Sequence, residues 1–411
     1  MNLLKKSRLG ELIEVTRGAS LSGEYYSTKG EYIRLTCGNF DYHNNCFKEN
    51  TSKDNLFYTG EFREEFLLEK GDIITPLTEQ AIGLLGTTAR IPKSGKYIQS
   101  QDIALVKCKA GKIDPTFCYY LISSRLVRNQ LSAAAQQTKI RHTSPDKIKA
   151  CTVWIPELDE QITIGRLLAS LDDKIHLNKR INDNLEAMAR QLYDYWFVQF
   201  DFPNEDGKPY KSSGGAMVWN EKLKREIPQG WSDCKLKDFI DLFDSKRVPL
   251  SSKYRGERQG AYPYYGATGI MDYVNDYIFD GDYILLAEDG STSDAKGFPI
   301  VQYIWGKNWV NNHAHIILPK NERYTMFTYQ MLRSIPAKQI ETGSIQKKIS
   351  QENLCGYKMA LPNSDLMEKY ENIVSPLWEK RKRCIEEINA LTKQRDELLP
   401  LLMNGQVSAN I

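Results

Sequence analysis

Apolar residues recur with a regular spacing in two long segments of the chain. In the first segment, successive positions alternate steps of four and three residues from Ile164 to Trp196. The second segment repeats this spacing from Tyr370 to Leu402, 206 residues further on. A period of about 3.5 residues, sustained over roughly four heptads, predicts coiled-coil helices. The apolar positions of the predicted seam are Ile164, Leu168, Leu171, Ile175, Leu185, Leu192, Val374, Leu377, Ile388, Leu391 and Leu398.

Four polar residues also occupy seam positions, namely Asn178, Asn182, Arg381 and Arg395. Polar groups in a coiled-coil seam fix the register and the partner at some cost in stability. Because the two helices are repeats of one another, each is the expected partner of the other. An internal two-fold axis across the helices would make the pair antiparallel.

The sequence in front of each helix is repeated as well. Ser144–Pro156 reads SPDKIKACTVWIP, and Ser350–Pro362 reads SQENLCGYKMALP. Related segments open the two copies at Arg8–Ser22 and Lys235–Ser251. A period of about half the chain indicates two similar globular units related by an internal pseudo-two-fold.

Short β-branched and aromatic runs bounded by turn residues recur in both copies and are typical of strands. The matching runs are Gly71–Leu77 with Gly281–Ala287 and Ser100–Val106 with Asn311–Ile317, and a short helix is expected at Phe117–Ile122 and Phe327–Leu332. The loops between them diverge in length and content. The sequence therefore predicts an α+β fold, in which two globular α/β domains are separated by a pair of long antiparallel helices.

A segment rich in Pro, Gly and Ser, Asp201–Trp231, connects the first helix to the second copy. Its composition predicts irregular chain. We expect it to run back along the molecule, because an antiparallel helix pair would need a long return connection.

The composition indicates neither a membrane protein nor a secreted one. Hydrophobic residues make up 41% of the 411 residues, and no apolar run reaches the ~18 residues that a membrane span needs. The eight cysteines include no C-x-x-C pair and are read as reduced thiols. The net charge of +3 neither requires nor excludes binding to nucleic acid. We expect a cytoplasmic protein.

Motifs for catalysis are missing from the sequence. No Asn/Asp-Pro-Pro-Tyr/Phe segment of an amino-methyltransferase occurs, and no glycine-rich turn that would hold a nucleotide. Pro145 and Asp146, followed by Asp172 and Lys174, resemble the carboxylates of metal-dependent nucleases, but the last two lie in the heptad segment. We therefore predict no catalytic site.

His313 and His315 alternate like two metal ligands on one strand face. No third ligand is evident, and the matching residues Asp102 and Ala104 cannot repeat the arrangement. A structural or base-contacting histidine is therefore favoured over a metal site.

The divergent loops contain residues suited to reading DNA. Arg and Lys can pair with guanine and Asn with adenine, and basic side chains also bind phosphates. A solvated loop is the alternative for each of these runs. A second group of basic residues precedes the repeated segment in both copies, as a phosphate clamp on two half-sites would require. The candidates in the loops are Tyr42, His43, Asn44, Lys253, Arg255 and Arg258, and the candidates for the clamp are Lys139, Arg141, His142, Lys347 and Lys348.

The segment Leu192–Trp231 resembles the central region of specificity subunits from bacterial type I restriction-modification systems. The resemblance implies two target-recognition domains, each reading one half of a split DNA sequence, with the helices as a spacer. It places the first domain at residues 1–150, the central conserved segment and spacer helix at 151–200, a linker at 201–230, the second domain at 231–355, and the distal segment with the second helix at 356–411.

The resemblance also implies that the chain is not an enzyme. Two modification subunits would dock on the helices, restriction subunits would complete the complex, and S-adenosylmethionine, ATP and Mg²⁺ would be bound by these partners. An aromatic cluster at the helix end suits docking of a partner, with capping of the first domain as the alternative. Its members are Tyr193, Tyr195, Trp196, Phe197 and Phe200. A free-standing duplicated DNA-binding regulator and a coiled-coil adaptor are the alternative functions.

Overall fold

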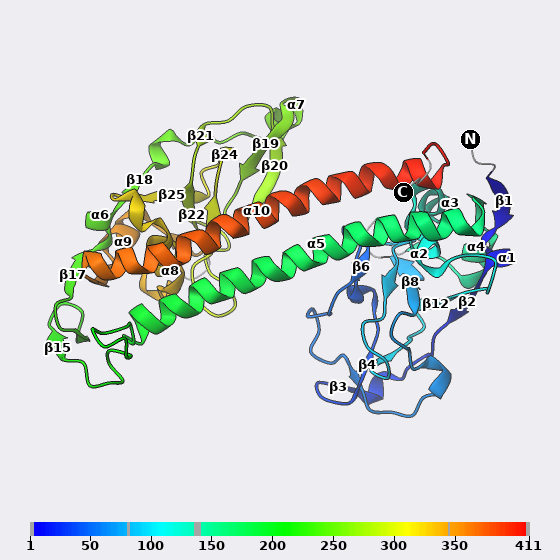
Figure 1. Ribbon diagram of the computed structural model, residues 1–411, viewed down its shortest axis with the longest axis horizontal. Helices are drawn as coiled ribbons and strands as arrows, with labels where there is room; N and C mark the ends of the chain where they lie inside the picture. The colour runs from blue at the N-terminus through cyan, green and yellow to red at the C-terminus, as the bar shows by residue number, and fades with distance from the viewer. Residues whose placement is uncertain (1–3, 80–82, 135–140, 344–345, 408–411) are drawn as a thin grey trace. The chain divides into compact units, whose positions relative to one another are not determined.

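The computed structural model describes residues 4–79, 83–134, 141–343 and 346–407. The chain divides into two compact units (Figure 1). Unit 1 consists of Met1–Lys179 and Glu386–Ile411, and unit 2 consists of Arg180–Ile385. The two long helices are shared between the units. Each unit therefore contains one globular part and one portion of each helix, whereas the sequence repeat assigned one whole helix to each half.

The long helices are α5 (Leu158–Tyr193), which continues into a π-helical turn, and α10 (Ser364–Met403). In unit 2, Arg381 of α10 pairs with Glu186 of α5 at 2.5 Å, and the Tyr370 hydroxyl donates to the carbonyl of Ala189 at 3.1 Å. Rising residue numbers in α5 thus meet falling numbers in α10. The helices are antiparallel, as predicted.

The predicted seam is the buried face of both helices. Ile164, Leu168, Leu171, Ile175, Leu185 and Val374 are buried, and Leu192, Leu377, Ile388, Leu391 and Leu398 are half-buried. In unit 1, the seam residue Arg395 pairs with Asp172 across the helices at 2.9 Å, and Tyr120 donates to the same carboxylate at 2.6 Å. Since an unpaired charge here would be costly, these interactions favour one register over its neighbours.

Each unit contains a four-stranded sheet with the same strand order. In unit 1 the order is β10 (Ala89–Arg90), β8 (Ile73–Pro76), β12 (Ile103–Cys108) and β2 (Ile13–Arg17). In unit 2 it is β23 (Val301–Ile304), β22 (Tyr283–Ala287), β25 (Ala314–Pro319) and β18 (Ile240–Leu242). The strands predicted from the repeat occupy equivalent places in the two sheets, which confirms the duplication.

The strand register corrects one sequence alignment by a single residue. Val106 faces Ile73 in unit 1, and its counterpart Ile317 faces Ile284 in unit 2. Ile73 is therefore equivalent to Ile284, and not to Tyr283 as the matching of Gly71–Leu77 with Gly281–Ala287 implied. Both strands are buried along nearly their whole length, so they carry no alternation that could have fixed the register.

The repeated segments in front of the long helices fold alike. In unit 1, β1 (Lys5–Arg8) pairs with β14 (Thr152–Ile155), and in unit 2, β17 (Ser232–Lys235) pairs with β28 (Lys358–Leu361). The helices α4 (Pro145–Ala150) and α9 (Gln351–Gly356) precede β14 and β28 and are capped by serine hydroxyls that accept a backbone amide at 3.2 Å. The remaining elements at this edge are α1 (Leu9–Leu12) and α6 (Leu236–Phe239).

A helix lies between the sheet and the long helices in each unit, and α3 (Arg125–Ala134) follows it in unit 1. In α2 (Pro115–Ser123) the carboxylate of Asp114 accepts the Phe117 amide at 2.8 Å, and Gly165 of α5 leaves room for this cap. In α8 (Thr325–Ser334) the amide of Phe327 instead donates at 2.8 Å to Glu371 of α10, the residue equivalent to Gly165. The two long helices therefore contact equivalent helix N-termini with different residues, a glycine in α5 and a glutamate in α10.

The second sheet of each unit differs more between the copies. In unit 1 its order is β11 (Tyr97–Ile98), β4 (Tyr32–Arg34), β7 (Phe57–Tyr58) and β3 (Tyr26–Ser27). In unit 2 it is β20 (Ile270–Val274), β19 (Gln259–Tyr265), β24 (Lys307–Val310) and β21 (Phe279–Asp280). Here the longer β19–β20 hairpin has no counterpart of similar length in the described residues of unit 1. A shared framework thus supports divergent surfaces.

The segment between the copies, Asp201–Trp231, is not entirely the irregular chain that its composition predicted. It contains a hairpin formed by β15 (Met217–Asn220) and β16 (Arg225–Pro228). At its end, Trp231 stacks on Phe202 near its start, with ring centroids 5.6 Å apart. The segment therefore starts and ends at one place in unit 2. The prediction that it runs back along the molecule is wrong.

The physical reason lies in the position of the second copy. Its core packs directly on the C-terminal end of α5, and α10 starts beside that end, where the rings of Tyr193 and Tyr370 lie 6.1 Å apart. The helices become antiparallel without any return of the chain.

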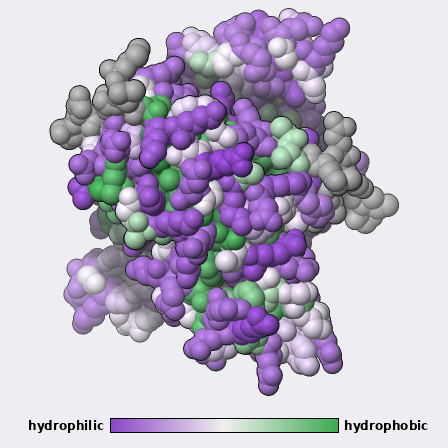
Figure 2. Space-filling model, turned by 90° about the vertical axis from the view of Figure 1, so that its right-hand side faces the viewer, coloured by the Kyte–Doolittle hydropathy of each residue, from purple (hydrophilic) through white to green (hydrophobic). Residues whose placement is uncertain are grey.

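The surface carries mainly polar residues. On the face shown in Figure 2, apolar residues appear only in small separate groups among hydrophilic ones. Within the described ranges, no helix is long and apolar enough to cross a bilayer.

Candidate nucleic-acid interface

The basic residues in front of the repeated segment occupy equivalent places in the two units. In unit 1 they form basic loop 1, Arg141–Thr143, and in unit 2 basic loop 2, Gln346–Ile349. The amide of Thr143 donates to the carbonyl of Leu77 at 2.8 Å, and the amide of Ile349 donates to the carbonyl of Glu288 at 2.8 Å. By the corrected register, Leu77 and Glu288 are equivalent residues. Both loops are therefore held by the same backbone hydrogen bond.

Basic loop 1 presents one paired and one exposed side chain. Arg141 in β13 (Arg141–His142) pairs with the buried Glu79 of β9 (Thr78–Glu79) at 3.4 Å, and a third of its side chain is exposed. His142 is exposed. Lys139 lies outside the described residues.

Basic loop 2 presents two lysines that are about half exposed. Lys347 pairs with Glu341 of β26 (Glu341–Thr342) at 3.1 Å, and Lys348 of β27 (Lys348–Ile349) pairs with Glu288 at 3.2 Å. Their side chains are 52% and 53% exposed, so phosphates could replace the carboxylate partners without rearranging the backbone.

The candidate residues of the Tyr42–Asn44 turn divide into exposed and structural ones. The turn joins β5 (Phe40–Asp41) to β6 (Cys46–Phe47). The Asn44 side chain donates to Asp41 at 2.7 Å and accepts from Lys179 of α5 at 3.3 Å, so its hydrogen-bonding capacity is largely used within unit 1. Tyr42 and His43 are exposed and their rings pack against each other at 4.0 Å.

The candidates around α7 (Ser252–Glu257) also differ from one another. Arg255 is only 13% exposed, because it pairs with Asp272 of β20 at 3.1 Å and donates to the carbonyl of Leu250 at 2.7 Å. It therefore anchors α7 to the β19–β20 hairpin. Lys253 is exposed, and the guanidinium of Arg258 lies 5.3 Å from the ring centroid of Tyr254.

Two exposed tyrosines beside these residues were not among the candidates. Tyr254 is 49% exposed and Tyr273 of β20 is 48% exposed. Aromatic rings beside basic groups are suited to stacking and hydrogen bonding with nucleic acid. Tyr254 lies inside the basic run Ser251–Gly260, and this neighbourhood was the sequence signal available for it.

The aromatic cluster at the end of α5 is a core and not a surface. The exposed fractions of Tyr193, Trp196, Phe197 and Phe200 are 5%, 4%, 6% and 5%. They pack with Phe327 and Tyr370 inside unit 2. A docking surface has to be exposed, so the docking prediction is wrong for these four residues, and they do not cap the first domain either. Tyr195 is 38% exposed, and its role in docking a partner stays a prediction.

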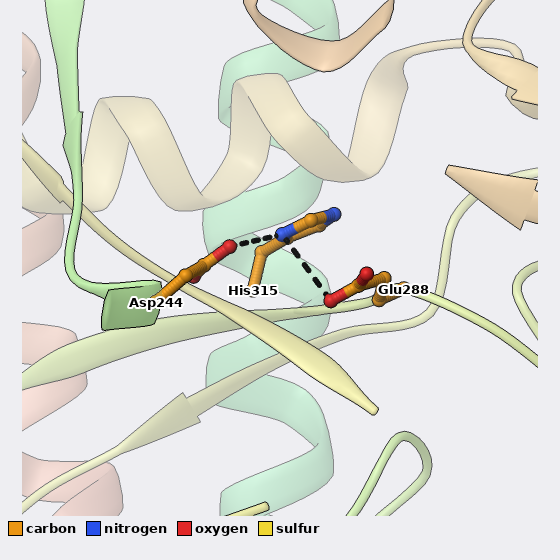
Figure 3. A group of neighbouring side chains, drawn as sticks. All are labelled: Asp244, Glu288 and His315. Carbon is orange, nitrogen blue, oxygen red and sulfur yellow. Dashed lines mark hydrogen bonds and ion pairs between the residues drawn. The ribbon is translucent and has the colours of Figure 1, made fainter. Parts of the chain in front are cut away.

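Four charged side chains of unit 2 converge around the buried His315 of β25. Its partners Asp244 and Glu288 bring ligand-type atoms within 4.8 Å of one another (Figure 3). Arg247 and Lys348 also pair with these carboxylates, at 2.7 Å and 3.2 Å from Glu288. Both carboxylates thus already have cationic partners, which disfavours a metal ion, and burial excludes contact of His315 with a base, so a structural histidine is left of the two roles that the sequence favoured. His313 is about half exposed and pairs with Asp289 at 2.7 Å.

A family model described as "Type I restriction modification DNA specificity domain" matches residues 1–187 and again residues 228–389. The chain belongs to this family. The two matches correspond to the two copies of the repeat. The family has the main function indicated by the sequence, a DNA-specificity subunit without catalytic activity, and neither a free-standing regulator nor an adaptor.

Individual relatives agree with this assignment. The chain is 29% identical over 384 residues to the HindI specificity subunit of Haemophilus influenzae, covering 76% of this chain and 81% of that protein. It is 24% identical over 312 residues to the MjaIX specificity subunit of Methanocaldococcus jannaschii, covering 71% and 68%. The crystal structure of the type I restriction-modification S subunit from M. genitalium matches with a TM-score of 0.61 and 18% identity, covering 98% of this chain and 96% of that one. This last match shows a shared fold.

Proposed function

We propose that each unit reads one half of a bipartite DNA target, and that the helix pair sets the spacing and docks two modification subunits. The observation that carries this proposal is the pair of equivalent basic loops, each held on the same framework beside surfaces that differ between the units. Identical phosphate binding with different neighbouring surfaces is what two unlike half-sites require. S-adenosylmethionine, ATP and Mg²⁺ would be bound by the modification and restriction subunits.

Reconstitution with a modification subunit tests this function. We expect the purified chain alone to transfer no methyl group, and the chain together with its modification subunit and S-adenosylmethionine to methylate adenine in a split sequence. Sequencing of the methylated sites is the measurement. Methyl transfer by the chain alone, or methylation of a continuous site, would contradict the proposal.

Alanine at the basic loops is expected to weaken binding to all DNA sequences. In the assembled enzyme, Lys347→Ala with Lys348→Ala should lower the slope of log affinity against log salt by roughly 1 for each phosphate that is no longer neutralised. Lys139→Ala with Arg141→Ala should act in the same way.

Lys222→Ala with Lys224→Ala provides a matched control, because these two lysines of unit 2 are also exposed and paired with carboxylates but lie in the β15–β16 turn. The control should leave the slope unchanged. A changed target sequence at an unchanged slope would instead identify the loop residues as base readers.

A further inference from the structure

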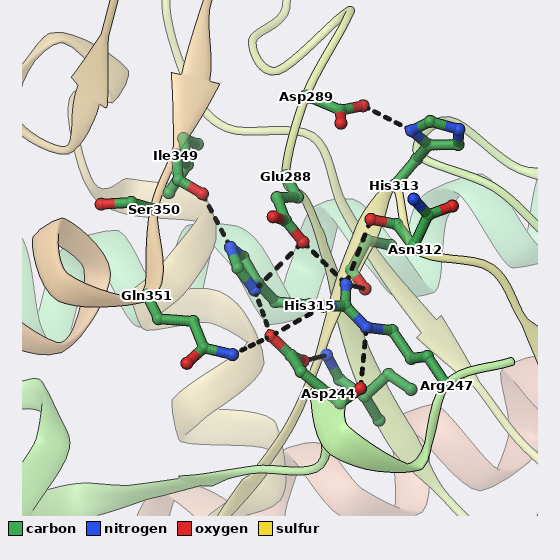
Figure 4. Close-up of polar contacts among 12 residues, drawn as sticks. Asp244, Arg247, Glu288, Asp289, Asn312, His313, His315, Ile349, Ser350 and Gln351 are labelled. Carbon is green, nitrogen blue, oxygen red and sulfur yellow. Dashed lines mark hydrogen bonds and ion pairs between the residues drawn. The ribbon is translucent and has the colours of Figure 1, made fainter. Parts of the chain in front are cut away.

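Both ring nitrogens of His315 face hydrogen-bond acceptors. Nδ1 lies 2.6 Å from Oδ2 of Asp244, and Nε2 lies 2.7 Å from the carbonyl oxygen of Ile349 (Figure 4). The side chain is completely buried, so water cannot replace either partner. The protonation of the ring therefore follows from these two interactions.

The carbonyl of Ile349 can only accept, so Nε2 carries a proton. The carboxylate of Asp244 accepts from the Ile316 amide at 2.8 Å and from Gln351 at 2.6 Å, and the guanidinium of Arg247 lies 3.5 Å away, so donors and a positive charge independent of His315 favour its ionised form. Asp244 is thus an ionised acceptor, and Nδ1 carries a proton too. The ring with both protons is an imidazolium cation.

The charged groups around the ring come from four places in unit 2. Asp244 follows β18, and Arg247 comes three residues later and lies 3.5 Å from its carboxylate. Glu288 follows β22, with Oε2 3.8 Å from Nδ1, and Lys348 belongs to β27. The pair of His313 and Asp289 is the neighbouring titratable pair, at the exposed side (Figure 4).

These interactions converge on the backbone of Ile349. Its carbonyl accepts from His315 and its amide donates to the carbonyl of Glu288 at 2.8 Å. Gln351, two residues on, donates to Asp244 at 2.6 Å. The lysine at position 348 is the immediate neighbour of this doubly fixed residue, so the direction of basic loop 2 depends on the imidazolium.

The described residues of unit 1 form no such network at the equivalent place. Ala104 occupies the position of His315, since Ala104 pairs with Thr75 of β8 and His315 pairs with the equivalent Leu286 of β22. Arg17 lies opposite Ala104 in the sheet. Arg17 replaces Asp244, and Leu77 replaces Glu288. Basic loop 1 retains the backbone bond from Thr143, but alanine at position 104 has no ionisable group that could fix the loop carbonyl in this way. The two loops therefore share a framework, and basic loop 2 adds an interaction with a buried histidine.

We propose that His315 is a positioning residue which, as an imidazolium, fixes basic loop 2, and that the position of this loop, and with it recognition by unit 2, is consequently sensitive to the protonation of a buried histidine that unit 1 replaces by Ala104. The hydrogen bonds of the cation are fully present at low pH. One of them is lost when the ring gives up a proton at higher pH, because the neutral ring can donate to only one of its two acceptors. The effect on DNA rests on the proposed function, whereas the effect on the loop does not.

Hydrogen exchange of two backbone amides in the full chain tests the positioning role without DNA. From about pH 5 to about pH 9, the protection factor of the Ile349 amide should fall about tenfold or more, as loss of a hydrogen bond from a charged donor predicts. The Thr143 amide, which makes the equivalent bond in unit 1, should keep its protection. Equal behaviour of the two amides, or nitrogen NMR signals of a neutral His315 ring at the lower pH, would overturn the proposal.

Substitution of the histidine gives the matched comparison. In His315→Gln the Ile349 amide should be poorly protected at every pH, and the same should hold for His315→Ala, which copies unit 1. A pH response that survives in these variants would also overturn the proposal.

DNA binding by the assembled enzyme tests the functional consequence. As pH rises, the salt slope of the wild type should decrease by roughly 1 more than that of the His315→Gln enzyme, because all other side chains at the interface are the same in both. An enzyme that binds no split DNA site at any pH would refute the proposed function while leaving the exchange experiment valid. Identical pH profiles of wild type and His315→Gln would refute the link between His315 and recognition.

Discussion

Exchange of residues 1–156 for the corresponding segment of another specificity subunit is expected to replace one half of the methylated sequence and to leave the other half unchanged. The second sheet of unit 1 lies within this segment, and among the described residues the sheets of unit 1 contain no strand of unit 2. The exchange has to reach Pro156, because β14 pairs with β1 and a joint at Lys149 would combine strands from two proteins. Sequencing of methylated DNA is the measurement.

The reciprocal exchange of Ser232–Pro362 provides the control and should replace only the other half. It begins at β17 and ends after β28, which pair with each other. If either chimera altered both halves, the units would read DNA jointly and the modular function would be wrong. Thermal unfolding of the chimeras confirms that the joints are tolerated.

Insertion of one heptad into each long helix is expected to increase the spacing between the half-sites by about three base pairs. Seven residues add about 10 Å of helix. The apolar seam stays on the same face of each helix because the insertion equals one heptad. The structure indicates the positions, between Lys179 and Arg180 in α5 and between Ile385 and Glu386 in α10, where the two units divide. The half-site sequences should stay the same.

A heptad inserted into α5 alone is the informative control. The ion pairs of Arg395 with Asp172 and of Arg381 with Glu186 cannot then both form in one register. We expect this variant to be destabilised by several kcal/mol, since breaking one buried ion pair costs about 3–5 kcal/mol. If the double insertion folds and methylates the old spacing, the helices do not set the distance.

The repeat and the helices could be read from the sequence because both are periodic patterns along the chain. The heptads predicted the face of α5 and α10 that is buried or half-buried, and the repeated segments predicted two similar units, in which β14 and β28 occupy equivalent places. Short, fully buried strands show no such periodicity, so the sequence does not fix how they align. The sequence alignment of β8 with β22 was accordingly wrong by one residue.

Only the tertiary structure decided the roles of individual polar and aromatic residues. The sequence cannot show whether a ring such as Phe197 faces solvent or a core, since this depends on which chain segments pack against it; here Phe327 and Tyr370 bury it. In the same way, the sequence could not show that Arg255 anchors α7, because this role depends on its contacts with Asp272 and Leu250.

The network around His315 joins residues that lie far apart in the sequence. Asp244 and Ile349 are separated by more than a hundred positions, and polar residues in such a network follow no spacing that a sequence could reveal. Folding removes the ring from water, and its protonation is then determined by the acceptors that surround it. The sequence therefore determined the duplicated framework, and tertiary packing alone decided the chemistry by which its second half differs from its first.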